Sequence, residues 1–155
     1  MYFDIAIEKT LRYGDKTFVL CSRFSTNDKG LVLFGPSGSG KTLTLKAMAG
    51  LLTPDKGRIM IGGQVLYDSQ ARINTPTRKR KVGYLFQDYA LFPHLTVWQN
   101  VAFGLKPLFR SLGLQRKRRV QDLLDLFHLA DQAGLRPAQL SGGQKQRTAL
   151  ARALA

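Results

Sequence analysis

The chain has 155 residues, of which 44% are hydrophobic, and this is enough for one globular domain with a buried core. No run approaches the ~18–20 apolar residues of a membrane-spanning helix, and the first residues do not resemble a secretion signal. Cys21 is the single cysteine, so an intrachain disulfide is excluded and we expect a cytoplasmic protein. The net charge of +14 favours anionic partners.

Two runs, residues 78–81 and 116–119, consist entirely of Lys and Arg. Such runs either bind phosphate groups or form solvated faces. Because neither run is interleaved with the aromatic residues that stack on nucleobases, a solvated face is the favoured interpretation of both.

The first 34 residues predict strands, because apolar and polar residues alternate over residues 3–7 and residues 17–24 are rich in β-formers. Tyr13 lies between these two stretches, directly before Gly14. Its ring either offers a face on which a nucleobase stacks or belongs to a half-buried loop side chain. The sequence does not decide between these two interpretations.

Residues 35–42 fit the P-loop pattern G-x-x-x-x-G-K-[ST]. They follow an apolar run, residues 31–34, that predicts a strand buried on both faces, and they precede a predicted helix over residues 43–52. The N-terminus of a helix directs unpaired N–H groups and positive partial charge toward one point, which suits a phosphate. The predicted phosphate-binding residues are Gly35, Pro36, Ser37, Gly38, Ser39, Gly40, Lys41 and Thr42.

The residue types in this loop match the chemistry of phosphate binding. Its glycines allow positive φ angles and a close approach of the backbone to phosphate oxygens. The ammonium of Lys41 would reach the β- and γ-phosphates, and the hydroxyl of Thr42 would bind the Mg²⁺ that bridges them. A chance glycine-rich turn is the alternative, but the predicted strand and helix on either side favour phosphate binding.

Residues 58–67 contain two β-rich arms around Gly62 and Gly63, which predicts a two-residue hairpin. A polar loop is predicted over residues 68–81, and residues 82–86 predict a second buried strand. Gln87 lies at the C-terminal end of that strand, where ligands bind in open α/β sheets. A neutral amide at this position would orient a water molecule or complete the coordination of a metal.

The loop over residues 89–95 is dense in large apolar side chains, so we expect it to be an interaction surface and not core. Thr96 and Gln99 predict a capping box for a helix that starts at Val97, and Pro107 is expected to end this helix.

Residues 115–130 predict an amphipathic helix with an apolar stripe on one side. The motif LSGGQ follows at residues 140–144, where Ser141 and Gln144 fit a second capping box. Two glycines therefore lie at the start of a helix whose first N–H groups have no internal partner. This predicts a second anion-binding helix end, with a flexible turn as the alternative.

Three motifs together, GPSGSGKT at residues 35–42, Gln87 within LFQD, and LSGGQ at residues 140–144, resemble the ATP-binding cassette (ABC) ATPases, the motor subunits of ABC transporters. Residues 82–97 further resemble the importers of the sulfate, molybdate, iron and spermidine/putrescine type. Within that group, we favour molybdate or another oxyanion as the transported solute.

The resemblance implies an α/β fold of the P-loop NTPase class, ABC ATPase type, with an N-terminal antiparallel β part and a helical insertion before LSGGQ. Residues 1–155 would form the N-terminal part of an ABC ATP-binding domain. Residues 1–87 would be the β-rich and P-loop core, residues 88–140 the helical subdomain, and residues 141–155 the signature motif with its helix.

The resemblance also implies ATP and Mg²⁺ as cofactors. Lys41 and Gln87 match catalytic positions of the family, Thr42 and Gln87 match positions that contact Mg²⁺, and Tyr13 matches the aromatic residue that stacks on adenine. In this family two ATPase subunits pair head to tail, so that the signature motif of one closes over the ATP of the other. The matching residues are Ser141, Gly142, Gly143 and Gln144.

Further implied partners are transmembrane permease subunits and, indirectly, a solute-binding protein, with a location on the cytoplasmic face of the cell membrane and no nucleic acid. The Walker B aspartate, the catalytic glutamate and the switch histidine of the family are expected beyond residue 155. We therefore expect this chain to bind ATP without efficient hydrolysis. Two other hypotheses remain: a nucleotide-binding module that never hydrolyses, and a soluble ABC ATPase acting on nucleic acid or the ribosome, which only the net charge favours.

Overall fold

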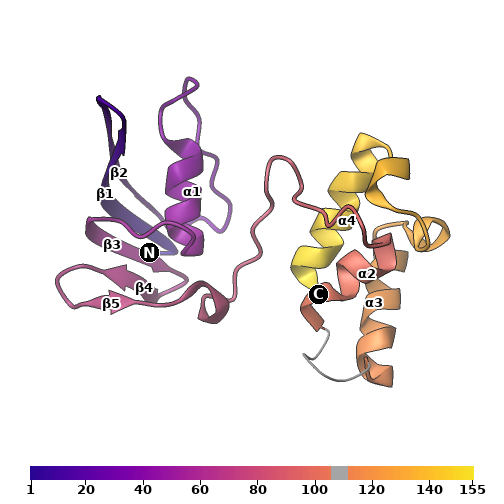
Figure 1. Cartoon of the computed structure of the whole chain (residues 1–155). Helices are drawn as coiled ribbons and strands as arrows, with labels where there is room; N and C mark the ends of the chain where they lie inside the picture. The colour runs from indigo at the N-terminus through magenta and orange to yellow at the C-terminus, as the bar shows by residue number, and fades with distance from the viewer. Residues whose placement is uncertain (106–111) are drawn as a thin grey trace. The chain divides into compact units, whose positions relative to one another are not determined.

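A computed structural model describes residues 1–105 and 112–155 of the chain, which form two compact units, residues 1–82 and residues 83–155. Each unit has its own hydrophobic core. The first contains a β-sheet and one α-helix, and the second is helical (Figure 1).

Within the described residues, the strands of the first unit form one antiparallel sheet in the order β2-β1-β3-β4-β5 (Figure 1). The helix α1 packs against this sheet, and side chains from its inner face join Ile5, Leu20 and Ile59 in the core. The elements are β1 (Phe3–Tyr13), β2 (Lys16–Thr26), α1 (Lys41–Ala49), β3 (Lys56–Ile61), β4 (Gln64–Asp68) and β5 (Ile73–Asn74), with a 3₁₀-helix at Thr77–Lys79.

The predicted N-terminal strands and the hairpin are confirmed. Ile5 and Ile7 of β1 are buried, as the alternating pattern predicts for a sheet with one face on the core. Between β3 and β4, Gly62 and Gly63 have φ angles of 58° and 78°. Positive φ at both central residues defines the type I′ turn, whose twist matches that of the paired strands, so glycine is needed at this turn.

The two predicted buried strands, over residues 31–34 and residues 82–86, are wrong for this structure. Neither segment has strand geometry, and Val32 and Phe34 are 86% and 99% exposed. A central strand needs hydrogen-bonded neighbours and helices on both faces, and none of the strands in the described residues pairs with either segment. The apolar runs are present, but the structure of residues 1–105 and 112–155 does not bury them as strands.

The predicted polar loop over residues 68–81 also contains regular structure. The short strand β5 pairs with β4, and a 3₁₀-helix follows at Thr77–Lys79. The favoured interpretation of the basic run 78–81 as a solvated face is wrong for Arg80, which is only 4% exposed, while the other three residues of the run are exposed.

The second unit packs three α-helices around a core that includes Val101, Leu124 and Leu129 (Figure 1). They are α2 (Val97–Ala102), α3 (Leu114–Leu126) and α4 (Gly142–Leu154), with 3₁₀-helices at Phe103–Leu105, Ala130–Gln132 and Pro137–Gln139. The predicted capping box of α2 is confirmed, and α2 ends at Ala102. Pro107, which was expected to end it, lies outside the described residues. The amphipathic stripe of α3 is confirmed as well, because Val120, Leu123 and Leu124 are buried.

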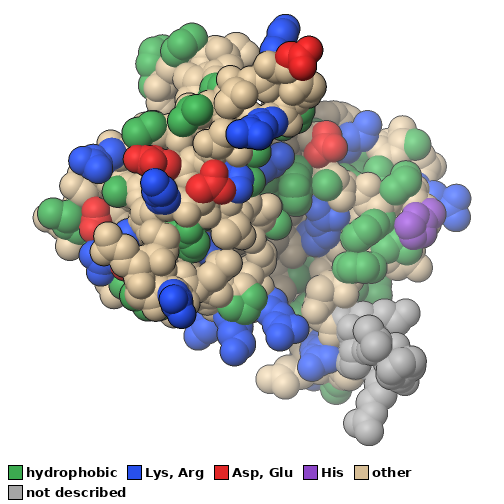
Figure 2. All heavy atoms as spheres, turned by 60° about the vertical axis from the view of Figure 1, so that its left-hand side comes forward, with side chains coloured by type: hydrophobic (Ala, Val, Ile, Leu, Met, Phe, Trp, Pro, Cys, Tyr) green, Lys and Arg blue, Asp and Glu red, His purple; other side chains and the backbone are tan. Residues whose placement is uncertain are grey.

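The basic run at residues 116–119 is exposed at the start of α3, as both a solvated face and a phosphate-binding patch would be. On the face shown in Figure 2, Lys and Arg side chains are spread over the surface and outnumber Asp and Glu side chains. Among the described residues, no helix combines the length and the apolar composition needed to cross a bilayer.

Candidate functional site

The P-loop runs directly into α1. Gly40 is the N-cap of this helix and has a left-handed backbone, with φ 90°. A Cβ atom at Gly40 would lie 2.4 Å from Cδ1 of Leu20, so both the backbone angle and the packing require glycine here. Because the first N–H groups of an α-helix have no intrahelical acceptor, the loop and the start of α1 direct backbone donors toward the same place.

Lys41 is the first residue of α1, and its side chain folds back over the loop. Its Nζ donates hydrogen bonds to the carbonyl oxygens of Gly35 (2.8 Å) and Pro36 (2.7 Å) and to Oγ of Ser39 (3.3 Å). Thr42 is exposed beside it. An ammonium held by neutral oxygens at a helix N-terminus is an attractive point for an anion, which would replace these carbonyls as hydrogen-bond acceptor.

The other end of α1 is held by the buried Arg80. Its Nη1 donates to the carbonyl oxygens of Ala47 (2.8 Å) and Met48 (2.9 Å), and its Nε donates to that of Thr75 (2.7 Å). Burial lowers the pKa of the Arg80 guanidinium. The cation lies at the negative end of the α1 dipole, so Arg80 stabilises the orientation of the helix that carries the P-loop.

Tyr13 is the last residue of β1 and is 70% exposed. The interpretation as a half-buried loop side chain is therefore wrong. The ring is accessible to a stacking partner, and Tyr13 belongs to the same unit as the P-loop.

The signature sequence LSGGQ starts α4. Ser141 is the N-cap, and its Oγ accepts a hydrogen bond from the backbone N–H of Gln144 (3.3 Å), while Oε1 of Gln144 accepts one from the N–H of Ser141 (2.8 Å). This confirms the predicted capping box and the helix start. Leu140 is buried beneath it.

Gly142 and Gly143 occupy the first turn of α4 although the packing of this unit does not require glycine there. A Cβ atom at Gly142 would meet nothing within 4 Å among the described residues, and one at Gly143 would meet only the tip of Arg147 at 3.9 Å. Glycine in a helix costs roughly 1 kcal/mol relative to alanine. Two such residues at an exposed helix start are therefore typical of a surface that another molecule approaches closely.

Gln87 is exposed and lies in the second unit, in a segment without regular structure, whereas the P-loop and Tyr13 lie in the first. The structure thus places Tyr13 and residues 35–42 in one unit, and Gln87 and residues 141–144 in the other.

The apolar loop over residues 89–95 packs against the start of α2. The buried side chain of Asn100 accepts a hydrogen bond from the N–H of Phe92 (2.9 Å) and donates to the carbonyl oxygens of Phe92 (3.2 Å) and Leu95 (3.1 Å). The ring of Phe92 packs against that of Phe103, with ring centroids 4.3 Å apart and ring planes tilted by 37°. Leu91, Phe92 and Leu95 are half-buried, and Ala90, Pro93 and His94 are exposed.

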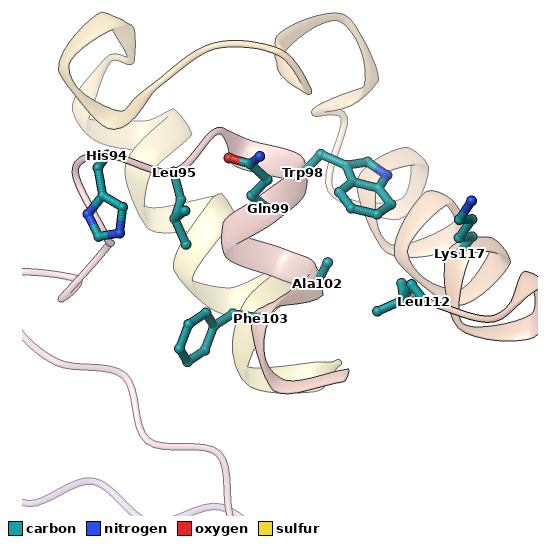
Figure 3. Close-up of a pocket in the computed structure, with 8 residues that line it drawn as sticks. All are labelled: His94, Leu95, Trp98, Gln99, Ala102, Phe103, Leu112 and Lys117. Carbon is teal, nitrogen blue, oxygen red and sulfur yellow. The ribbon is translucent and has the colours of Figure 1, made fainter. Parts of the chain in front are cut away.

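A cavity of about 370 Å³ opens beside this loop, between α2 and α3 (Figure 3). Its walls are mostly apolar, and the one charged group among the described residues that line it is the ammonium of Lys117. An apolar cavity with a cationic rim suits a protein segment that presents an apolar side chain and an acidic group. The lining residues are His94, Leu95, Trp98, Gln99, Ala102, Phe103, Leu112 and Lys117.

Sequence reasoning missed three polar residues that hold these elements: Arg80, Asn100 and Arg152. Arg80 has no distinguishing sequence signal, because its neighbours in the run are also basic. Asn100 lies in the stripe of α2 next to buried Val97 and Val101, and Arg152 lies four residues after the buried Thr148. A polar residue on the buried face of an amphipathic helix is the signal that would have identified Asn100 and Arg152.

Comparison with known proteins agrees with the motifs. The sulfate/thiosulfate import ATP-binding protein CysA of Synechocystis sp. is 47% identical over 145 residues, which are 93% of this chain and 39% of that protein. The molybdenum import ATP-binding protein ModC of Paramagnetospirillum magneticum is 43% identical over 148 residues, which are 96% of this chain and 40% of that protein. The chain therefore spans about two fifths of the length of these relatives.

A solved structure shares the fold. The dimeric structure of a post-hydrolysis state of the ATP-binding cassette MJ0796 bound to ADP and Pi superposes with a TM-score of 0.77 at 31% identity, over 100% of this chain and 69% of that chain. The sequence profile described as ABC transporter matches residues 25–155. Because this profile covers most of the chain and the fold is that of an ABC ATPase cassette, the chain belongs to the ABC transporter family.

Proposed function

We propose that this chain is the nucleotide-binding part of an ABC importer ATPase, and that its P-loop binds the phosphates of ATP. The observation that carries the proposal is the loop at the start of α1, where Lys41 Nζ donates hydrogen bonds to the carbonyl oxygens of Gly35 (2.8 Å) and Pro36 (2.7 Å). Phosphate oxygens would accept hydrogen bonds from this ammonium, in place of the two carbonyls, and from the free N–H groups of the helix start. The ADP and Pi of the MJ0796 cassette support the choice of nucleotide.

Thr42 and Gln87 are the side chains of this chain that we propose for Mg²⁺ bound together with the nucleotide. The first turn of α1, which is fully described, contains no acidic residue, and the described residues contain no group of three or more His, Cys, Asp or Glu side chains suited to a metal. The hydroxyl of Thr42 would supply one ligand, phosphate oxygens and water would supply others, and Gln87 would approach the metal or a water molecule. Mg²⁺ bound in this way neutralises charge on the phosphates. Tyr13 would stack on the adenine.

The signature motif would bind the ATP of a second subunit. Ser141 and the start of α4 offer a hydroxyl and helix N–H groups, and Gly142 and Gly143 allow a close approach that nothing inside the unit requires. The dimer of the MJ0796 cassette supports a second ATPase subunit. We expect Gly142→Ala to keep or raise the stability of α4 and to abolish ATP-dependent pairing of subunits in sedimentation, whereas unchanged pairing would contradict this role.

The assembly would hydrolyse ATP to drive import of a small solute, because the relatives are named as import ATP-binding proteins. Relatives named for sulfate, molybdenum, spermidine/putrescine and Fe(3+) import match at 47%, 43%, 48% and 50% identity, so identity does not rank these solutes. An oxyanion stays the class of solute we propose, in line with the sulfate and molybdenum relatives, and molybdate has no preference over sulfate. Permease subunits on the cytoplasmic side of the membrane would dock on the loop 89–95 and the adjacent cavity. Lys117→Glu should weaken this docking, and Arg118→Glu, an exposed residue of the same helix outside the cavity lining, is the control.

The test of the whole proposal is titration of a fluorescent ATP analogue. We expect Lys41→Ala to lower the affinity about tenfold to hundredfold, since one charge-assisted contact contributes roughly 1.5–3 kcal/mol. Lys46→Ala is the matched control, because it removes the same charge from the last turn of the same helix. Equal affinity of Lys41→Ala and the wild type would refute ATP binding by this loop.

A further inference from the structure

The segment that carries Gln87 contacts α4 on both sides of this residue. Before it, Gly83 passes Ala153 so closely that a Cβ atom at Gly83 would lie 3.1 Å from the Ala153 carbonyl oxygen. After it, the guanidinium of Arg152 donates one hydrogen bond to the carbonyl oxygen of Ala90 (2.7 Å) and another to that of Tyr89 (3.0 Å). Both contacts come from the last two turns of the helix that starts with the signature motif.

Arg152 holds a stretch of backbone that is strained by itself. Tyr89 and Ala90 have φ angles of 62° and 45°, in the left-handed region that residues with a Cβ rarely adopt. Two successive residues stay in this region only where their surroundings hold them. The two carbonyls that accept from Arg152 belong to these same two residues.

The guanidinium also fixes the next part of the loop. It lies over the ring of Phe92, with 5.5 Å from its central carbon to the ring centroid, in the geometry of a cation–π contact. Burial lowers the pKa of Arg152, as expected for a cation removed from water. Asn100 holds Phe92 and Leu95 from α2, so the loop 89–95 is fixed to α4 at its start and to α2 at its end.

We propose that Arg152 is a positioning residue that ties the segment carrying Gln87, and the loop 89–95 that follows it, to the signature helix α4. The eleven residue steps from Ser141 to Arg152 span about 16 Å of helix. A shift of α4 caused by nucleotide at Ser141 would then move the carbonyls of Tyr89 and Ala90, and with them Gln87 and the loop 89–95. This inference rests on the proposed function of Gln87, the signature motif and the loop.

The first experiment tests the hydrogen bonds of Arg152 to Tyr89 and Ala90, here called the Arg152 clamp, by amide hydrogen exchange in the chain itself. It does not depend on the proposed function. In Arg152→Gln the N–H of Tyr89, which donates to the Phe86 carbonyl at 3.0 Å, should exchange at least about tenfold faster than in the wild type. The N–H of Asn100 in α2 should keep its rate. Arg119→Gln is the matched control, because Arg119 also bonds the end of α4, at the Leu154 carbonyl (3.0 Å).

Arg152→Lys separates charge from geometry. Lysine keeps the cation over the Phe92 ring but lacks the fork that reaches two carbonyls, so we expect exchange rates between those of the wild type and Arg152→Gln. If Arg152→Gln fails to fold, the comparison of Arg152→Lys with Arg119→Gln decides the question. Wild-type exchange at Tyr89 in every Arg152 variant that folds would overturn the proposal.

The second experiment measures ATP hydrolysis by the assembled transporter, with and without its membrane subunits. In Arg152→Gln the stimulation of kcat by the membrane subunits should fall at least about fivefold, while KM for ATP stays within about twofold. Stimulation equal to that of the wild type, or an equal loss in Arg119→Gln, would overturn the positioning role. A wild-type assembly that neither binds ATP nor responds to membrane subunits would refute the proposed function instead. In that case the exchange rate at Tyr89 would still test whether Arg152 holds the loop.

Discussion

Replacing Arg80 by methionine tests whether a buried cation stabilises the helix that carries the P-loop. Methionine keeps an unbranched apolar side chain that reaches as far as Nε of arginine, but it removes the charge and every donor. Arg80 donates to the carbonyl oxygens of Met48 (2.9 Å) and Thr75 (2.7 Å), and to that of Ala47, which also accepts from the N–H of Gly50. Two carbonyls therefore depend mainly on the guanidinium.

The magnitude follows from these acceptors. A buried carbonyl that loses its donor costs roughly 1–3 kcal/mol, so the two together cost about 2–6 kcal/mol. Burial of the guanidinium carries a desolvation cost, which also lowers the pKa of Arg80. Because Arg80→Met removes this cost, part of the loss from the two carbonyls is offset. We expect Arg80→Met to lower the free energy of unfolding by about 2–4 kcal/mol, which is a large part of the ~5–15 kcal/mol of a typical domain.

The assay is urea unfolding followed by far-ultraviolet circular dichroism, at a concentration where the wild-type chain is monomeric. The midpoint should fall by about 1–3 M urea in Arg80→Met. Arg78→Met is the matched control, since Arg78 is exposed in the same basic run and its replacement should change stability by less than about 0.5 kcal/mol. Equal midpoints for the two variants would refute the assignment of a stabilising role to Arg80.

Three further outcomes are expected. Gly40→Ala should lower the free energy of unfolding by about 2–4 kcal/mol in the same assay, because its Cβ would clash with Leu20 at a φ of 90°; a change below about 0.5 kcal/mol would contradict this packing. The hydrogen bonds from Lys9 and Thr10 lower the pKa of Asp55, so Asp55→Asn should destabilise the chain above pH ~4. This difference in the free energy of unfolding should disappear as pH falls through the lowered pKa of the folded carboxyl. A difference that does not change with pH would show that the charge of Asp55 does not cause it. Phe34→Ser should reduce self-association of the chain in light scattering, because Phe34 is 99% exposed, and equal association would show that other surfaces cause it.

Local sequence rules determined the features that depend on neighbours along the chain. The Gly62-Gly63 hairpin, the capping boxes at Thr96 and Ser141, the amphipathic face of α3 and the helix after the P-loop all require only a few adjacent residues, and the structure confirms each of them. Their hydrogen bonds close within a turn or a hairpin, so periodicity and residue type were sufficient evidence.

The sequence by itself determined the family and the local chemistry of the candidate site, because P-loop and signature motif are short contiguous patterns. Only the tertiary structure decided which apolar runs become strands and which polar residues hold the site. Residues 31–34 have the composition of a central strand but no hydrogen-bonded neighbours among the described residues. Arg80 and Arg152 bond carbonyls 32–33 and 62–63 positions away along the chain, and such contacts leave no local periodic signal because they form only when distant segments pack together.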